Sequence, residues 1–105
     1  MDTMFIDAAG RRWIVASPFD LHAIHRVRQL ASIDLLMVAR GDKPFPTHDQ
    51  PRTVLALWAI VKPEATSVGI TVTEFTQAMQ DPDLQAAAVE AVLEALSVST
   101  AAKES

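Results

Sequence analysis

The stretch P-R-T-V-L-A-L-W-A-I-V, residues 51–61, decides the fold of this 105-residue chain. It is the most apolar run in the sequence and holds one of the two tryptophans. Pro51 suits the first turn of a helix, where the missing N–H would have no intrahelical partner in any case. Pro63 follows soon after the stretch. Because proline disfavours helical geometry at the residue before it, the sequence predicts that this helix ends near Lys62.

Both sides of the predicted central helix are apolar. One face carries the i, i+3, i+4, i+7 spacing of a buried stripe, with Val54, Leu57, Trp58 and Val61. The other side carries Leu55, Ala59 and Ile60. A helix that is apolar all round lies inside a core or at an interface. In so short a chain we expect the second face to lack intrachain cover unless the following loop and the terminal helix supply it.

The segment G-D-K-P-F-P-T-H-D-Q, residues 41–50, is a predicted loop because its two prolines block regular structure. Phe45 lies between Pro44 and Pro46. It is either a plug that folds back onto the core or an exposed anchor for a partner, and the cost of a lone exposed aromatic favours the plug. The candidate partner-binding residues for a partner protein or a second copy of this chain are therefore Leu55, Trp58, Ala59, Ile60 and Phe45.

Residues 4–16 predict a β-hairpin with its turn at residues 8–11, where Gly10 is free to adopt a positive φ. A lone two-stranded hairpin is marginal in water, so it must lie against the helices or pair with another strand. Its free edges are a possible docking surface, although edges are often merely protected.

Helix-capping signals divide the remainder of the chain. Ser17, Pro18 and Asp20 predict a helix start, and that helix either runs to Arg40 or breaks near Ser32. Gly41 is the expected C-terminal glycine.

Two later signals predict two further helices. Thr71 and Glu74 form a capping box before a short helix. Asp81 and Pro82 start an alanine-rich helix that ends at about Val98. The expected fold is mainly α with a short N-terminal β-hairpin, an α+β domain of four to five helices. We expect one domain over residues 1–98, with a hairpin at 4–16 and helices over 17–98, followed by a flexible tail at 99–105.

The amino-acid composition argues against several classes of protein function. Half of the residues are hydrophobic, the net charge is −4, and cysteine is absent, which rules out a disulfide framework and thiolate metal sites. No basic cluster is visible in the sequence, so nucleic acid is not an expected partner. The N-terminus lacks the pattern of a signal peptide, and no apolar run approaches the length of a membrane span.

The sequence carries no catalytic or cofactor-binding motif that we recognise. His22 and His25 are three residues apart and His48 lies in the loop, but this spacing matches no zinc-binding pattern. No phosphate-binding loop or nucleophile elbow is present among the three glycines. We therefore expect no enzyme activity, no cofactor and no metal site.

A family resemblance rests on three short segments of the sequence, which occur in a fixed order. They are P-F-D-L at residues 18–21, L-A-L-W-A-I-V-K-P-E at 55–64 and T-V-T-E-F at 71–75. Together with the hairpin and the alanine-rich terminal helix, they resemble the tail assembly chaperones of long-tailed bacteriophages and prophages over residues 5–97. The resemblance implies a non-enzymatic factor of the host cytoplasm that coats the tape measure protein and recruits tail tube subunits. Such a factor is absent from the finished virion.

Two other functions remain open at this point. One is a structural neck or tail-completion protein of the virion that uses the hairpin for strand addition. The other is a small bacterial adaptor or regulatory protein.

Overall fold

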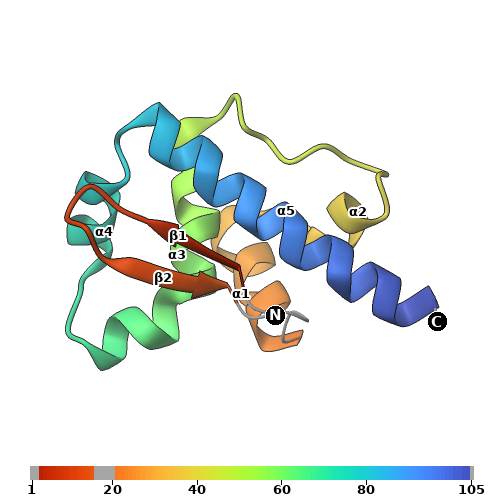
Figure 1. Cartoon of the computed structure of the whole chain (residues 1–105). Coiled ribbons are helices and arrows are strands. Elements are labelled where there is room, and N and C mark those ends of the chain that lie inside the picture. The colour runs from red at the N-terminus through yellow and green to blue at the C-terminus, as the bar shows by residue number, and fades with distance from the viewer. Residues whose placement is uncertain (1–2, 16–20, 105) are drawn as a thin grey trace.

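A computed structural model describes residues 3–15 and 21–104, with side chains of the last helix described as far as Leu96. The fold is a two-stranded hairpin followed by five helices (Figure 1), which confirms the predicted α+β class. The elements are β1 Thr3–Ile6, β2 Arg12–Val15, α1 Leu21–Ala31, α2 Leu35–Ala39, α3 Gln50–Ser67, α4 Val72–Ala78 and α5 Pro82–Glu104. The helix start predicted at Ser17, Pro18 and Asp20 lies outside the described residues.

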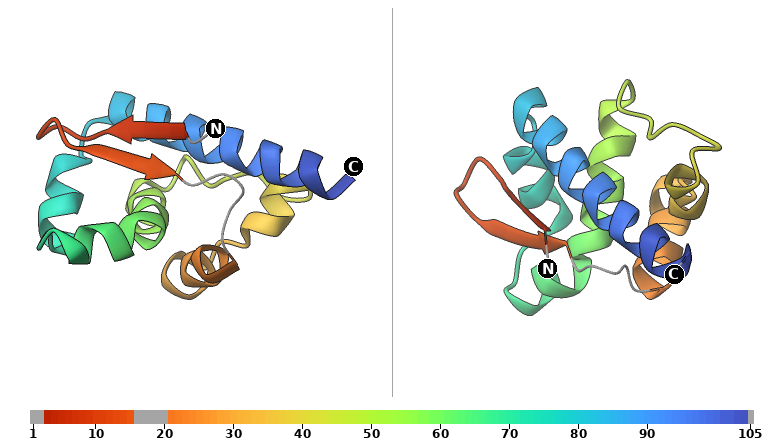
Figure 2. Two further views of the ribbon diagram at one scale, coloured as in Figure 1. Left: turned by 60° about the horizontal axis from the view of Figure 1, so that its bottom comes forward. Right: turned by 45° about the vertical axis from the view of Figure 1, so that its right-hand side comes forward.

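The hairpin is antiparallel, with Met4 opposite Ile14 and Phe5 opposite Trp13. Gly10 in the connecting turn has a φ of 79°, as predicted. Because side chains alternate along a strand, Phe5 and Trp13 point into the molecule while their neighbours point outward. The hairpin lies over the helices, with β1 alongside α5 (Figure 2). The Thr3 hydroxyl donates to the Ala91 carbonyl of α5 at 2.9 Å, which ties the two elements together.

The helix predicted either to run to Arg40 or to break near Ser32 does break there, into α1 and α2. Ser32 takes a positive φ of 57°, a conformation that L-residues rarely adopt, and it ends α1. Asp34 then caps α2 by accepting a hydrogen bond from the Leu36 N–H at 3.0 Å. Gly41 follows α2 with a φ of 79°, which confirms its predicted place after the helix end.

The central helix α3 passes through Pro63 and ends at Ser67, so the predicted end near Lys62 was wrong. Pro63 has no N–H to donate to the carbonyl of Ala59, four residues earlier. The Arg26 Nε of α1 donates to that carbonyl at 2.9 Å. The side chain of another helix thus satisfies the carbonyl that the proline leaves free, and the helix continues. Its start agrees with the predicted place of Pro51 in the first turn, and Asp49 caps the helix by accepting from the Arg52 N–H at 3.2 Å.

The last two helices begin as their capping residues predict. Thr71 and Glu74 form the complete capping box of α4. Asp81 accepts from the Asp83 N–H at 2.8 Å at the start of α5. The helix continues to Glu104, beyond the predicted end at about Val98.

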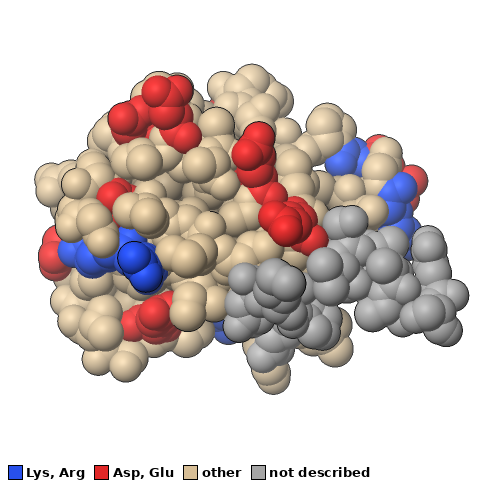
Figure 3. All heavy atoms as spheres, in the orientation of Figure 1, with Lys and Arg blue, Asp and Glu red and all other residues tan. Residues whose placement is uncertain are grey.

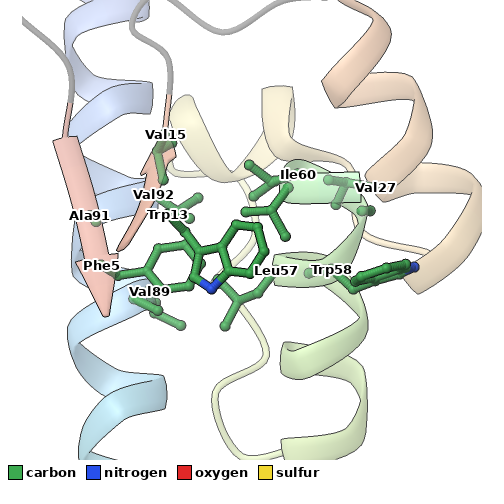
Figure 4. Packing of buried hydrophobic residues seen from close by; sticks show 14 of the residues in the cluster. Phe5, Trp13, Val15, Val27, Leu57, Trp58, Ile60, Val89, Ala91 and Val92 are labelled. Atoms are coloured by element: carbon green, nitrogen blue, oxygen red, sulfur yellow. The ribbon is translucent and has the colours of Figure 1, made fainter. Parts of the chain in front are cut away.

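Phe75 of α4 lies at the centre of an aromatic cluster in the core. Its ring centroid is 6.5 Å from that of Phe5, 5.6 Å from Trp13 and 5.7 Å from Trp58. The hairpin side chains point from one side toward Leu57 of α3 (Figure 4). Residues from β1, β2, α3 and α4 therefore meet in one core, and the hairpin is part of that core.

Candidate functional site

The face of α3 predicted to lack cover is covered by the chain itself. Ala59 is fully buried, and Trp58 and Ile60 are less than a tenth exposed. Phe45 is also buried, so the plug interpretation of the loop is confirmed. Of the five candidate partner-binding residues, Leu55 alone presents a sizeable surface, with 38% exposure.

Two polar contacts hold this cover in place. The Thr53 hydroxyl of α3 donates to the Pro46 carbonyl at 3.0 Å, which fixes the proline-rich loop beside the helix. Arg26 joins α1 to α3 through its bond to Ala59. The structure therefore places four of the predicted residues in the core and does not bring them together as a surface.

A different apolar surface lies on the outward side of the hairpin. Met4, Ile6 and Ile14 are 44%, 45% and 53% exposed. Strand alternation puts these three side chains on one face, opposite Phe5 and Trp13, and Met4 and Ile14 are direct cross-strand partners. We call these three side chains the hairpin outer face. In the view of Figure 1, charged side chains are scattered over this side, with broad areas of other residues between them (Figure 3).

The hairpin outer face stands on a rigid turn that is organised by Asp7. The Asp7 carboxylate is buried and accepts four hydrogen bonds, from the N–H groups of Ala9 and Arg11, from Arg11 Nε at 2.8 Å and from Trp13 Nε1 at 3.0 Å. The Ala8 N–H donates to the Ala78 carbonyl at the end of α4, which anchors the turn to the helices. The face is therefore held in one conformation before any partner binds.

The same contacts keep Asp7 ionised. Burial by itself raises the pKa of this carboxyl group, but hydrogen bonds from the Arg11 and Trp13 side chains, the Arg11 N–H and the nearby guanidinium charge outweigh burial. The net result is a pKa below the ordinary value of 3.8. The Arg11 guanidinium thus forms an ion pair with Asp7, with Nε 2.8 Å from Oδ2.

The outer edge of β2 is free of backbone partners within the described residues. The Asp7 N–H donates to the Arg11 carbonyl, so these two residues form a hydrogen-bonded pair of the hairpin. Hydrogen-bonded and non-hydrogen-bonded pairs alternate along an antiparallel hairpin, so Arg12 and Ile14 belong to non-hydrogen-bonded pairs. The backbone groups of Arg12 and Ile14 consequently point away from β1, and no described residue bonds to them there. A free edge of this kind is a template for an added strand.

Strand alternation was the signal that would have predicted the hairpin outer face. The hairpin edges were predicted as a docking surface, whereas the outward side chains of Met4, Ile6 and Ile14 were not. Their exposure depends on which face of the hairpin packs, and Phe5 and Trp13 decide that by joining the core.

The described part of the chain holds neither a metal-binding cluster nor a helix suited to span a membrane. There, His, Asp and Glu side chains form no group of three or more that would hold a metal ion. None of the helices, over the same residues, combines the length and apolar character needed to cross a membrane. Comparisons with protein-family models, curated proteins and solved structures give no match.

Proposed function

We propose that this chain is a non-enzymatic assembly factor that binds an apolar segment of a partner protein through the hairpin outer face. The observation that carries the proposal is the exposure of Met4, Ile6 and Ile14 on one side of a hairpin whose other side is buried. Side chains of this size are costly to leave in water, and clustered apolar exposure is typical of interaction surfaces.

The construction of this face suits reversible binding of a partner. Because Asp7 and the core hold the hairpin in place, binding requires little ordering of this chain, which favours affinity from a small contact area. The area itself is modest, so release does not require the loss of a large interface. The net charge of −4 favours solubility of the free protein.

The family resemblance supports a tape measure protein as the partner within this proposal. The chain acts as a tail assembly chaperone, binds a phage tape measure protein, helps to recruit tail tube subunits and remains in the host cytoplasm. The resemblance implies a long, apolar, helical partner, which suits the exposed apolar side chains of the hairpin outer face. The binding surface differs from the one expected on α3, where Trp58, Ala59 and Ile60 are buried.

Co-expression with a phage tape measure protein tests this proposal. We expect a soluble complex with the wild-type chain and loss of the complex with the double variant Met4→Thr/Ile14→Thr. Threonine retains strand propensity while removing apolar surface, so the hairpin itself is preserved. Val68→Thr is the matched control, because Val68 is 62% exposed and lies outside the hairpin.

Two results would contradict the proposal. One is a tape measure protein that forms no complex and remains insoluble in the presence of the wild-type chain. The other is equal binding by the hairpin variant and the Val68→Thr control, which would move the interaction away from the hairpin outer face.

The free edge of β2 favours a second candidate function, a neck or tail-completion protein that joins a ring by strand addition. The backbone groups of Arg12 and Ile14 would pair with a strand of the neighbouring subunit. Quantitative analysis of purified virions separates the two candidates. A chaperone is absent from finished tails, whereas a structural component is present in a fixed number of copies.

A further inference from the structure

An open cleft of about 660 Å³ lies where the end of α1, the helix α2, the proline-rich loop and the start of α3 meet. It is separate from the hairpin outer face, and none of the five candidate partner-binding residues lines it. Its lining combines cationic and apolar side chains. The lining includes Arg28, Asp34, Met37, Lys43, His48 and Arg52.

The charges of this cleft are unbalanced. Arg28, Lys43 and Arg52 contribute three cations, and none of them forms an ion pair in the described part of the chain. Asp34 is the single carboxylate in the lining, and its Oδ1 already accepts the Leu36 N–H as the cap of α2. Three cations against one carboxylate leave the lining with a net charge of about +2, and in a chain with a net charge of −4 this local excess favours an anionic ligand.

Arg52 is held in place at the wall of the cleft. Its Nε donates to the Ala31 carbonyl at 2.7 Å, and its terminal nitrogen donates to the Ser32 carbonyl. Ser32 has the positive φ of 57°, and a non-glycine residue in this region is held there by its surroundings. Because a guanidinium group has five N–H donors, the two bonds leave others available to a carboxylate.

The other walls are apolar and include Met37, Ile33 and Pro46. We infer that this cleft binds an acidic segment of a protein, in which a Glu or Asp carboxylate meets Arg52, Lys43 and Arg28 while an adjacent apolar side chain packs on these walls. The mixed lining favours a peptide over a nucleic acid, because phosphate backbones require an extended basic stripe and the chain as a whole is acidic. The inference does not depend on the identity of the partner at the hairpin outer face.

The probe for this site is a terminally blocked peptide of alternating leucine and glutamate, titrated into the isotope-labelled full chain and followed by amide NMR. We expect saturable shifts at Ser32, Asp34, Lys43 and His48, with no comparable shifts at Ile14. The matched peptide with glutamine in place of glutamate should bind about tenfold more weakly, as expected when charge-assisted contacts are lost. Binding should also weaken as salt is raised.

The variant Arg28→Gln/Lys43→Gln removes two exposed cations of the cleft and should weaken peptide binding about tenfold. Lys62→Gln, an exposed lysine of α3 outside the cleft, should leave affinity unchanged. Amide spectra of both variants establish that they fold. Arg52 is left intact in this test because its bonds to the backbone contribute to the fold.

Several outcomes would overturn the inference. Equal affinity for the glutamate and glutamine peptides would remove the role of charge. Shifts confined to the hairpin would place the peptide elsewhere. Inorganic phosphate that reproduces the same shifts at the same concentration would show an unspecific anion site, and tighter binding of a single-stranded oligonucleotide would replace the peptide by nucleic acid.

Discussion

Asp7 shows how one buried carboxylate organises a turn. It follows β1, and its two oxygens accept the backbone and side-chain N–H groups that would otherwise lack partners inside the turn. Burial of a charge is tolerated here because four donors and the Arg11 guanidinium compensate for the lost hydration. Removal of that charge should therefore cost more than removal of an exposed carboxylate.

We predict that Asp7→Asn lowers the free energy of unfolding by about 2–4 kcal/mol, because the amide group turns an NH₂ toward donors that need an acceptor. Urea unfolding followed by tryptophan fluorescence measures the change. Asp42→Asn is the control, since the ion pair of Asp42 with Arg40 is exposed on both sides and should contribute less than about 1 kcal/mol. Equal effects of the two substitutions would show that the Asp7 network does not stabilise the fold.

Asp7 also predicts a pH dependence of stability. Its pKa is lower in the folded chain than the ordinary value of 3.8, so the unfolded chain binds more protons in this range. The stabilisation is fully present above the unfolded pKa and is lost as the pH falls through the folded pKa. Unfolding experiments from about pH 5 to about pH 2 should show a smaller loss for Asp7→Asn than for the wild type. Parallel curves would contradict this assignment.

At the scale of elements, α3 depends on a bond that the chain makes with another helix. Pro63 deprives the Ala59 carbonyl of its intrahelical donor, and Arg26 of α1 supplies the replacement. The two residues therefore act as a unit, and their substitutions should not be additive.

A double-mutant cycle tests this unit. Arg26→Met should cost about 1–3 kcal/mol, because it leaves the Ala59 carbonyl without a donor. In the Pro63→Ala background the restored N–H satisfies the carbonyl, so the same Arg26 substitution should cost at least about 1 kcal/mol less. Arg28→Met, an exposed neighbour on α1, should be close to neutral in both backgrounds. Additive effects would mean that Arg26 and Pro63 are not coupled.

The burial of α3 predicts the consequence of truncating its tryptophan. Trp58 is 8% exposed and lies against Phe75, so Trp58→Ala should destabilise the chain by about 3–5 kcal/mol. Thermal and urea unfolding measure the change. Leu55→Ala on the same helix, where the side chain is 38% exposed, should cost clearly less. A melting temperature that hardly moves in Trp58→Ala would assign this residue to an interface instead of the core.

At the scale of the whole molecule, α3 occupies the centre and is surrounded by the other elements (Figure 1). It contacts α1, α4, α5 and β2, so it cannot open without disrupting most of the core. The helix α2, Leu35–Ala39, is a single short element with partly exposed side chains. The stability of backbone hydrogen bonds should differ accordingly.

Native-state hydrogen exchange measures this difference. Amides in residues 54–61 of α3 should exchange slowest, through global unfolding, and amides of α2 should exchange at least about a hundredfold faster through local opening. The hairpin amides shared between β1 and β2 should be protected close to the level of α3, because Phe5 and Trp13 belong to the core. Equal protection of α2 and α3 would contradict this order.

The sequence by itself determined the local features of the fold. Asp34 and Asp49 lie at helix starts, Thr71 with Glu74 forms a capping box, and Gly10 adopts a positive φ. Each of these features depends on groups within about four residues, and short-range bonding rules decide them. The apolar stretch at residues 51–61 likewise determined that a helix would be buried. The mainly helical class with an N-terminal hairpin was predictable for the same reason.

Only the tertiary structure decided where surfaces remain. Whether α3 continues past Pro63 depends on Arg26, which is 33 residues away from Ala59. The burial of Trp58 and Ile60 depends on how distant elements pack. That packing therefore also decides that the candidate binding surface lies on the hairpin and not on α3. The basic cleft likewise joins Arg28, Lys43 and Arg52, which are scattered along the sequence. Spacing along a chain predicts what a residue does to its neighbours, whereas packing free energy, summed over the whole core, selects which distant residues meet.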